Sequence, residues 1–333
     1  MKALILERYG KSNKLEFADL PHPIIKPDEI LVQVHAVGLN PIDTMIPKGA
    51  FKPILKFKLP AIMGSDLAGV VVEVGNRVTR FLPGDAVYAS IFDLGSGSLA
   101  EYAVVPESAA AIKPEKLDYV QAASIPMVGL TSWQALKERA QIKLGQKVFI
   151  PAGSGGIGTF AIQLAKYLGA KVATTTSANN VGLVQRLGAD EVIDYKTQAF
   201  EKLLHGYDAV LWTVKGDAIE KALQIMNPNS SLISLIGPPD AAFARKRGMN
   251  FLMKLVFGLI SSKIIRLAKK RNIEYAFMFV HPDGKQLAEI GKLIDEGHIQ
   301  PVVDQVFSFD QTIKALAYLE SGRAKGKVVV KLI

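Results

Sequence analysis

The chain has 333 residues, of which 49% are hydrophobic and 21% charged, a composition typical of a globular α/β protein and not of a disordered chain. This length suits two domains. Cysteine is absent, which excludes disulfides, thiolate metal ligands and cysteine nucleophiles. No apolar stretch reaches the ~20 residues that span a bilayer, and the N-terminus lacks a signal-peptide core. A cytoplasmic protein is therefore expected.

The first third of the chain consists of short alternating runs separated by Gly and Pro, as in an antiparallel β domain. These runs are 29–37, 67–74, 86–89 and 99–105. From Tyr119 onward, strands alternate with helical runs, which predicts a doubly wound parallel sheet of the Rossmann type and an α/β fold class. The predicted strands are 147–151, 171–176, 191–195, 208–213 and 231–236.

A glycine-rich turn follows the strand predicted at 147–151. Gly153, Gly155 and Gly158 form the pattern G-x-G-x-x-G, and a predicted helix begins at Gly156. A strand before this pattern and a helix after it are the context of a dinucleotide-binding turn. In such a turn the glycines permit a tight bend, a close approach to the pyrophosphate and close helix packing, and the helix N-terminus attracts the anion. The alternative is a turn that only packs a helix. We predict a dinucleotide site that also includes Ser154, Gly156 and Ile157.

The next predicted strand ends in polar residues that carry no carboxylate. An NAD-binding protein usually has Asp or Glu here to hold the ribose 2′-OH. Thr176, Ser177 and Asn180 instead offer hydroxyls and an amide, and Tyr195 after the following strand is a further donor. This pattern favours NADP(H) over NAD(H). The alternative is that these residues only form a loop or a helix cap.

Basic residues are concentrated in one segment. Of the 40 Lys and Arg residues, nine lie within 241–273, which contains no Asp or Glu, and the rest of the chain has 31 residues of each sign. This distribution argues against specific nucleic-acid binding. Apolar residues at helical spacing predict a basic helical insertion. It is interpreted either as a cover over the substrate cleft or as an interfacial helix on an anionic membrane.

Several further motifs occur in order along the chain. With them, the chain resembles over its whole length the medium-chain dehydrogenase/reductase superfamily, in its zinc-free quinone oxidoreductase and alkenal/enone reductase branch. The resemblance implies a GroES-like β domain over 1–122 and 273–333, and a Rossmann domain that binds NADP over 123–272. The motifs are Gly38-Leu39-Asn40-Pro41-Ile42-Asp43, the segments 64–71, 84–88, 122–126 and 129–133, and Gly326-Lys327-Val328-Val329-Val330.

Zinc-dependent members of this superfamily bind the catalytic metal with two cysteines and a histidine. The matching positions here are Asn40, Ser65 and a residue near Gly129, none of which is a thiol or an imidazole. The five histidines show no metal-ligand spacing. No metal site is expected, so the substrate must be a small molecule that is already electrophilic.

The resemblance also implies the positions of the cofactor. Asn40 matches a position beside the nicotinamide ribose and the substrate carbonyl. Thr131 and the pair Ile236-Gly237 match positions at the nicotinamide, and Lys327 matches one near the cofactor.

The resemblance implies an apolar substrate pocket as well. Met45 and Phe51 replace the tyrosines of some quinone reductases. Phe279 is a candidate pocket residue, with packing in the core as the alternative. Asp43 and Asp66 are interpreted as structural, and no side chain is identified as catalytic.

The predicted function is NADPH-dependent reduction of enals, enones or quinones. The alternative is a non-catalytic NADP(H)-binding redox sensor or interaction protein. A homodimer is predicted through an apolar edge formed by the strands at 208–213 and 231–236. The alternative is a monomer in which the basic insertion covers that edge.

Overall fold

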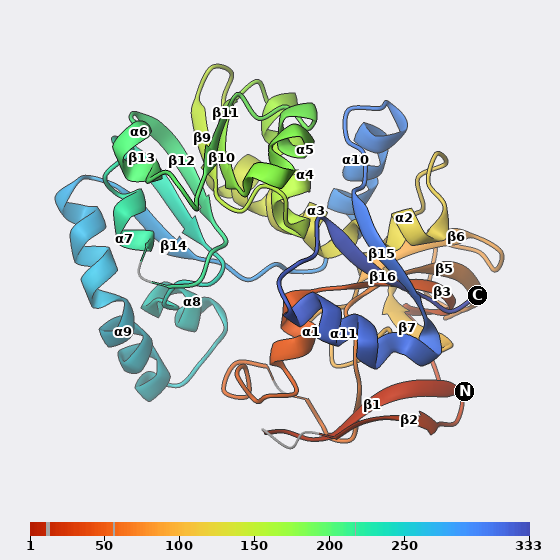
Figure 1. Ribbon diagram of the computed structural model, residues 1–333. Coiled ribbons are helices and arrows are strands. Elements are labelled where there is room, and N and C mark those ends of the chain that lie inside the picture. The colour runs from red at the N-terminus through yellow and green to blue at the C-terminus, as the bar shows by residue number, and fades with distance from the viewer. Residues whose placement is uncertain (11–13, 56, 217) are drawn as a thin grey trace. The chain divides into compact units, whose positions relative to one another are not determined.

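The computed structural model describes residues 1–10, 14–55, 57–216 and 218–333. They form two compact units, Met1–Leu130 with His281–Ile333 and Thr131–Val280 (Figure 1). These limits differ from the expected boundaries after 122 and before 273. Helix α2 (Tyr119–Ala123) packs on strands of the first unit, and β14 (Glu274–Phe277) pairs with a strand of the second, so both limits lie further along the chain.

The first unit is built on two sheets. A seven-stranded sheet has the order β15-β16-β3-β5-β6-β8, with β7 paired to β3, and a three-stranded sheet has the order β2-β1-β4. All pairs are antiparallel except β15 with β16. The strands are β1 (Lys2–Arg8), β2 (Lys14–Asp19), β3 (Glu29–Leu39), β4 (Ala61–Ile62), β5 (Asp66–Val74), β6 (Ala86–Ser90), β7 (Tyr102–Pro106), β8 (Ala110–Ile112), β15 (Val303–Ser308) and β16 (Lys327–Lys331).

Helices from both ends of the chain cover the seven-stranded sheet. Tyr88 on β6 is fully buried and its hydroxyl donates to the Leu287 carbonyl of α10 at 2.6 Å. Gly38 lets α2 approach β3, because a Cβ there would collide with the Ala123 carbonyl. The helices of this unit are α1 (Pro41–Met45), α2, the first part of α3 (Pro126–Trp133), α10 (Gly284–Asp295) and α11 (Thr312–Glu320).

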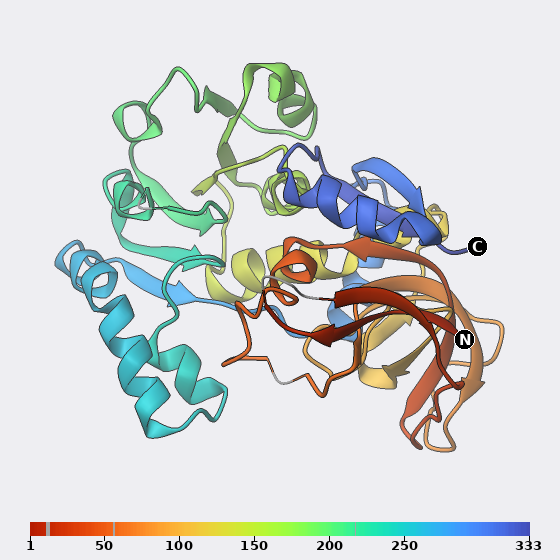
Figure 2. The ribbon, with the colours of Figure 1, turned by 60° about the horizontal axis from the view of Figure 1, so that its bottom comes forward.

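The second unit contains a fully parallel six-stranded sheet of order β11-β10-β9-β12-β13-β14 (Figure 2). Its buried core includes Phe149, Trp212 and Leu232. This topology confirms the predicted doubly wound sheet. Strands β9 (Lys147–Ile150), β10 (Lys171–Thr176), β11 (Glu191–Asp194), β12 (Tyr207–Trp212) and β13 (Met226–Ser234) are connected through α4 (Gly156–Tyr167), α5 (Val181–Arg186), α6 (Phe200–Leu203) and α7 (Ile219–Ala222).

The strand at the edge of the parallel sheet is not one of the two that the sequence predicts there. β12 lies between β9 and β13, and β13 is itself covered by β14, so neither predicted strand forms the edge. Residues 275–280 lie within the range 273–333 that the resemblance places in the β domain. This run supplies instead the edge strand β14, because its residues pair in parallel with β13 from Ser231↔Glu274 to Ser234↔Phe277.

The basic insertion folds as the helical hairpin α8 (Ala241–Lys246) and α9 (Phe251–Lys270), as Figures 1 and 2 show. Ile264 and Ala268 of α9 pack into the same core as Ile219 of α7 and Tyr275 of β14. Within the described ranges, no helix has the length and apolar character needed to cross a bilayer.

Candidate functional site

A buried polar cluster connects three distant segments of the first unit. We call Asn40, Asp43, Asp66 and Lys327 the Lys327 cluster; each is at most 4% exposed. The Lys327 ammonium donates to Asn40 Oδ1 at 2.6 Å and lies 3.5 Å from Asp66 Oδ2. Asn40 Nδ2 donates to the same Asp66 oxygen at 2.9 Å, and the Asn40 backbone N–H donates to Asp43 Oδ2 at 2.8 Å.

Strand pairing explains why these residues meet. β16 is antiparallel to β3, with Val328 opposite Leu39, so Lys327 lies next to Asn40 at the strand end. Asn40 precedes α1, and Asp43 lies within this short helix. Asp66 begins β5, the other neighbour of β3, and also accepts from the Met127 backbone N–H at 3.1 Å.

Burial controls the protonation of the cluster. Desolvation raises the pKa of Asp43 to about 7, although the Asn40 N–H bond opposes this shift. Burial also raises the pKa of Asp66 and lowers the pKa of Lys327. The attraction between these two charges has the opposite effect on each pKa, but burial is the larger cause. A low-dielectric environment disfavours every charged form, so all three groups shift toward neutrality. The Asp43 carboxyl therefore exchanges its proton near neutral pH.

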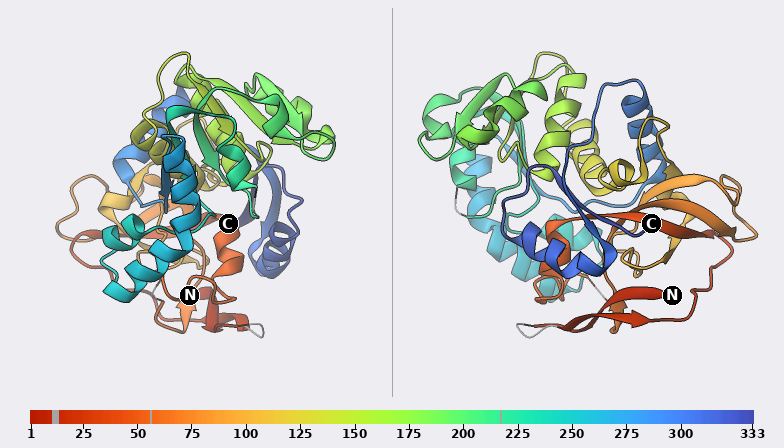
Figure 3. Two further views of the ribbon diagram at one scale, coloured as in Figure 1. Left: turned by 90° about the vertical axis from the view of Figure 1, so that its left-hand side faces the viewer. Right: turned by 45° about the vertical axis from the view of Figure 1, so that its right-hand side comes forward.

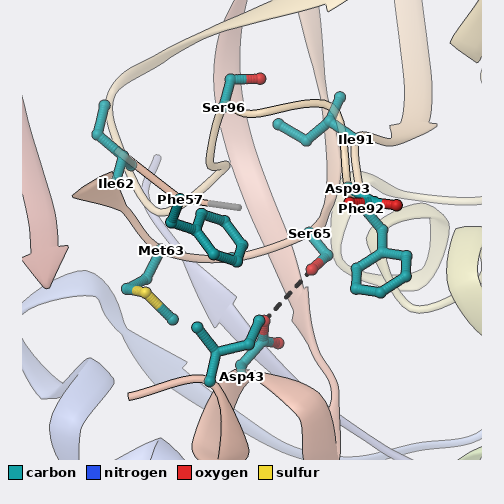
Figure 4. Close-up of a pocket in the computed structure, with 11 residues that line it drawn as sticks. Asp43, Phe57, Ile62, Met63, Ser65, Ile91, Phe92, Asp93 and Ser96 are labelled. Atoms are coloured by element: carbon teal, nitrogen blue, oxygen red, sulfur yellow. Dashed lines mark hydrogen bonds between the residues drawn. The ribbon is translucent and has the colours of Figure 1, made fainter. Parts of the chain in front are cut away.

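A small cavity adjoins this cluster, as Figure 4 shows. Asp43 and Ser65 are on its wall, and the Ser65 hydroxyl donates to Asp43 Oδ1 at 3.3 Å. The rest of the lining includes Phe57, Met63 and Phe92. Its volume of about 10 Å³ is close to the space that one water molecule needs. The cavity can admit a water or a proton carrier to Asp43, but not an organic substrate.

In the second unit, the glycine turn connects β9 to α4. A Cβ on Gly158 would lie 2.5 Å from the Ala152 carbonyl oxygen, so only glycine fits there. A Cβ on Gly153 would collide with the Thr174 hydroxyl. At Gly155 the only atom within 4 Å of a Cβ would be the Ala152 carbonyl oxygen, at 3.3 Å, so this position is tight but less crowded than the other two. Gly155 is the N-cap of α4 and provides no side-chain cap, which leaves the N–H groups of the first turn to a ligand.

Four hydrogen-bonded side chains lie beside this turn. We call these residues, Ser154, Thr176, Ser177 and Asn180, the Ser154 cluster. Thr176 Oγ1 donates to Ser154 Oγ at 2.9 Å. Asn180 Nδ2 lies 3.2 Å from Ser154 Oγ and 3.3 Å from Ser177 Oγ. Within the described part of the chain both serine oxygens act as acceptors, which leaves their own protons to donate to an anion.

The neighbouring strand β11 carries a carboxylate at this end, Asp194, opposite Thr176 in the β10–β11 pairing. Its Oδ1 accepts from the Lys196 backbone N–H at 3.0 Å. Tyr195 is 59% exposed, and its backbone N–H donates to the Thr176 carbonyl at 3.2 Å. The structure thus brings the predicted residues Thr176, Ser177, Asn180 and Tyr195 to the same end of the sheet.

The other predicted cofactor residues of the second unit lie on separate elements. Thr131 is buried in α3. Ile236 is 42% exposed after β13. The Gly237 N–H donates to Ser234 Oγ at 2.7 Å, and a Cβ there would approach that oxygen to 2.5 Å.

The predicted pocket residues have packing roles as well. Phe279 contacts Phe243 with ring centroids 5.2 Å apart, and Phe277 at 5.4 Å. Met45 lies in α1 and Phe51 in the turn after it, both half-buried. Neither Met45 nor Phe51 belongs to the lining of the cavity beside Asp43.

The residues at the superfamily's zinc positions do not suit that metal. Asn40 and Ser65 offer an amide and a hydroxyl, both occupied by Lys327, Asp66 or Asp43, where zinc takes thiolate, imidazole or carboxylate ligands. Among the described residues no group of three or more His, Cys, Asp or Glu side chains could hold a metal ion.

Sequence reasoning missed the position of Asp66 in the centre of the cluster. The sequence predicts a structural role for Asp66, and the structure shows it bound to both Asn40 and Lys327, two residues that the resemblance places near the cofactor. The segment Gly64-Ser65-Asp66 stood among the motifs, but only strand pairing shows that it faces Asn40.

Two family models match the chain. The model described as alcohol dehydrogenase GroES-like domain matches residues 26–115, and the model described as zinc-binding dehydrogenase matches residues 187–330. The first lies within the first unit. The second covers most of the parallel sheet and continues into the C-terminal part of the first unit.

Similar proteins match over nearly the whole chain. NAD(P)H oxidoreductase RTN4IP1, mitochondrial, of Danio rerio is 35% identical over 100% of this chain and 92% of its own length. The NADPH-dependent alkenal/one oxidoreductase, chloroplastic, of Arabidopsis thaliana is 34% identical, with coverage of 99% and 79%. The solved quinone oxidoreductase of Coxiella burnetii is 30% identical, with coverage of 100% and 99% and a TM-score of 0.84.

Proposed function

The chain belongs to the medium-chain dehydrogenase/reductase superfamily, in its zinc-free branch, and from this premise we propose that it reduces enals, enones or quinones with NADPH. It is an oxidoreductase with a nicotinamide cofactor. The choice of NADPH and of electrophilic acceptors is the proposal.

One observation carries the assignment of the cofactor. The glycine turn at Gly155 and the uncapped start of α4 lie beside the Ser154 cluster, where two hydroxyls retain a proton to donate. A pyrophosphate fits the helix N-terminus, and a 2′-phosphate fits hydroxyl and amide donors better than it fits a carboxylate. These residues bind and orient the cofactor.

The substrate class is supported by relatives and by the residues at the zinc positions. Similar proteins are named as alkenal/one and quinone oxidoreductases. Bound NADPH supplies a hydride to a carbon that conjugation has already made electrophilic. Asn40 and Lys327 are two of the polar residues that the family resemblance places near the cofactor, and their mutual hydrogen bond fixes both orientations. Binding and orientation then supply most of the acceleration.

The test mixes enzyme, NADPH and a panel of enals, enones and quinones, and follows the loss of NADPH absorbance. We expect turnover with several acceptors and none with simple alcohols plus NADP. Gly155→Val should weaken NADPH binding by about 100-fold. Its cost in stability should be smaller than that of Gly158→Val, because a Cβ at Gly155 meets only the Ala152 carbonyl oxygen, at 3.3 Å. Gly158→Val is the matched control that should disrupt the turn itself. Flat traces with every acceptor would refute the reductase.

A redox sensor or interaction protein is the remaining alternative. It predicts tight NADPH binding, weakened to the same extent by Gly155→Val, together with no turnover of any acceptor. The two functions therefore share the binding result and differ only in the acceptor assay.

Assembly as a homodimer is a further part of the proposal. β14 has a neighbouring strand on one side only within the described sheet, and although Asp240 accepts from its Phe277 N–H, we propose that a second copy pairs with the remainder of its other edge. Light scattering should give about twice the 36.1 kDa chain mass. A mass that stays at the single-chain value on concentration would contradict it.

A further inference from the structure

The long helix of the basic insertion, α9, has a buried face and an outer face, and the outer face is apolar in one half and cationic in the other. Phe257, Ser261, Ile264 and Ala268 are buried, and their spacing of three or four residues marks the face that packs on the second unit. In Figure 3 (left) the opposite face of α9 points away from the sheet, with no other element of the second unit in front of it. Along that outer face, apolar residues occupy the first half and cations the second.

Six large apolar side chains form the first half, and we call them the outer apolar row. They repeat at positions i, i+1, i+4, i+5, i+8 and i+9, so they lie in two adjacent lines, each about 12 Å long. A contiguous exposed apolar surface of this kind marks an interaction site. The members, with their exposed fractions, are Phe251 79%, Leu252 64%, Leu255 49%, Val256 37%, Leu259 65% and Ile260 53%.

Cations lie beyond both ends of this row. Arg245 and Lys246 end α8 before it, and Lys269, Lys270 and Arg271 close α9 after it. None of these five has an ion pair within the ranges that the structure describes, whereas Lys263 pairs with Glu220 at 2.7 Å. The insertion contains no Asp or Glu to neutralise them.

The outer apolar row is rigidly supported. Asp240 caps α8 by accepting from the Phe243 N–H at 2.7 Å, and its second oxygen accepts from the Phe277 N–H of β14 at 3.3 Å. Phe243 in turn packs against Phe257 of α9, with ring centroids 6.3 Å apart. The row is therefore presented by a folded hairpin and not by a loop that could bury it.

Three occupants of this surface can be compared by their chemistry. A second copy of the hairpin would bring like charges together, with no carboxylate on either side. A nucleic acid would satisfy the cations but leave the aliphatic side chains in water. An anionic lipid surface satisfies both, because headgroups attract the cations and the acyl boundary accepts the apolar row.

We propose that α9 docks on an anionic membrane surface, lying in its plane with the outer apolar row at the headgroup–acyl boundary and the flanking cations on lipid phosphates and carboxylates. This inference goes beyond the proposed reductase, because docking requires neither cofactor nor substrate.

The experiment floats the full chain with vesicles of phosphatidylcholine alone or with one third phosphatidylserine. We expect about tenfold or stronger partitioning onto the anionic vesicles, which high salt reduces. Leu252→Gln with Leu259→Gln should reduce that partitioning by about tenfold or more. Lys269→Glu with Lys270→Glu should have an effect of similar size.

Matched controls make the same changes elsewhere. Ile24→Gln with Leu144→Gln removes two side chains that are 94% and 86% exposed, and Lys143→Glu with Lys285→Glu makes the same change in net charge. Both controls should partition like the wild type. Circular dichroism and NADPH binding verify the fold of every variant.

Three results would overturn the proposal. One is equal partitioning of the wild type onto both kinds of vesicle. Another is loss of binding in the charge variant but not in the apolar variant, which would indicate a polyanion such as nucleic acid or an acidic protein. The last is a dimer that becomes monomeric in the apolar variant, which would make the row an interface between two copies.

Discussion

The Lys327 cluster and the Ser154 cluster are both polar, but they differ in burial and in the use of their hydrogen bonds. In the Lys327 cluster, charged groups are at most 4% exposed and bind one another. In the Ser154 cluster, neutral groups bind one another in a way that leaves two hydroxyl protons to donate. Burial makes the first cluster fixed and sensitive to pH, whereas the second is partly exposed and suited to an anion.

Lys327→Met should have the largest effect, because it leaves the side-chain oxygen of Asn40 and the Asp66 carboxylate without their cation. Removal of one partner from a buried ion pair costs about 3–5 kcal/mol, and urea unfolding measures this loss. Lys331→Met, on the same strand but exposed, is the matched control and should change stability little. Asp66→Asn added to Lys327→Met should recover part of the loss. Equal stability of the two lysine variants would show that the cluster is not held by this cation.

Asp43 should make stability depend on pH between about 4 and 7. Its folded-state pKa is raised to about 7 from an ordinary value of 3.8, so its contribution is full below the ordinary value and is lost as the pH rises through 7. From pH 5 to pH 8 this loss amounts to about 2.5 kcal/mol for a shift of this size.

The isosteric variant Asp43→Asn isolates this effect. Its amide oxygen can still accept from the Asn40 N–H, while the Ser65 hydroxyl can turn and accept from the new NH₂ group. Unfolding midpoints in urea at pH 5 and pH 8 should therefore converge in the variant. A pH dependence identical to that of the wild type would assign the titration to another group.

Ser177→Asp should produce a smaller, selective effect in the Ser154 cluster. A carboxylate beside the 2′-phosphate repels it, so NADPH binding should weaken by about tenfold or more while NADH binding is kept or improved. Ser177 suits this test better than Thr176, because Thr176 is 1% exposed and an aspartate there would be destabilising by itself.

Ser177→Ala is the matched control, since it removes one donor without adding charge. It should weaken NADPH binding by less than the aspartate does. Fluorescence titration with both cofactors measures the ratio. If the wild type binds NADH as tightly as NADPH, the proposed role of the Ser154 cluster is wrong.

Local patterns were sufficient to predict the parallel sheet and the glycine turn. Alternation of strands and helices depends on short-range spacing, and β10 occupies the predicted residues 171–176. Gly153, Gly155 and Gly158 specify the turn within six residues. At each of them a Cβ would crowd an atom of a near neighbour in the turn or of the adjacent strand. The members of the Ser154 cluster follow from the same principle, since parallel strands end at one side of a sheet.

Long-range pairing determined the remaining features. β14 is an edge strand of the parallel sheet and not part of the β domain, a choice between two sheets that a four-residue strand cannot encode alone. Asp66 and Lys327 meet only because β5 and β16 both flank β3. The pKa of Asp43 and the exposure of the outer apolar row depend on which neighbours exclude water, and residue type does not contain that information.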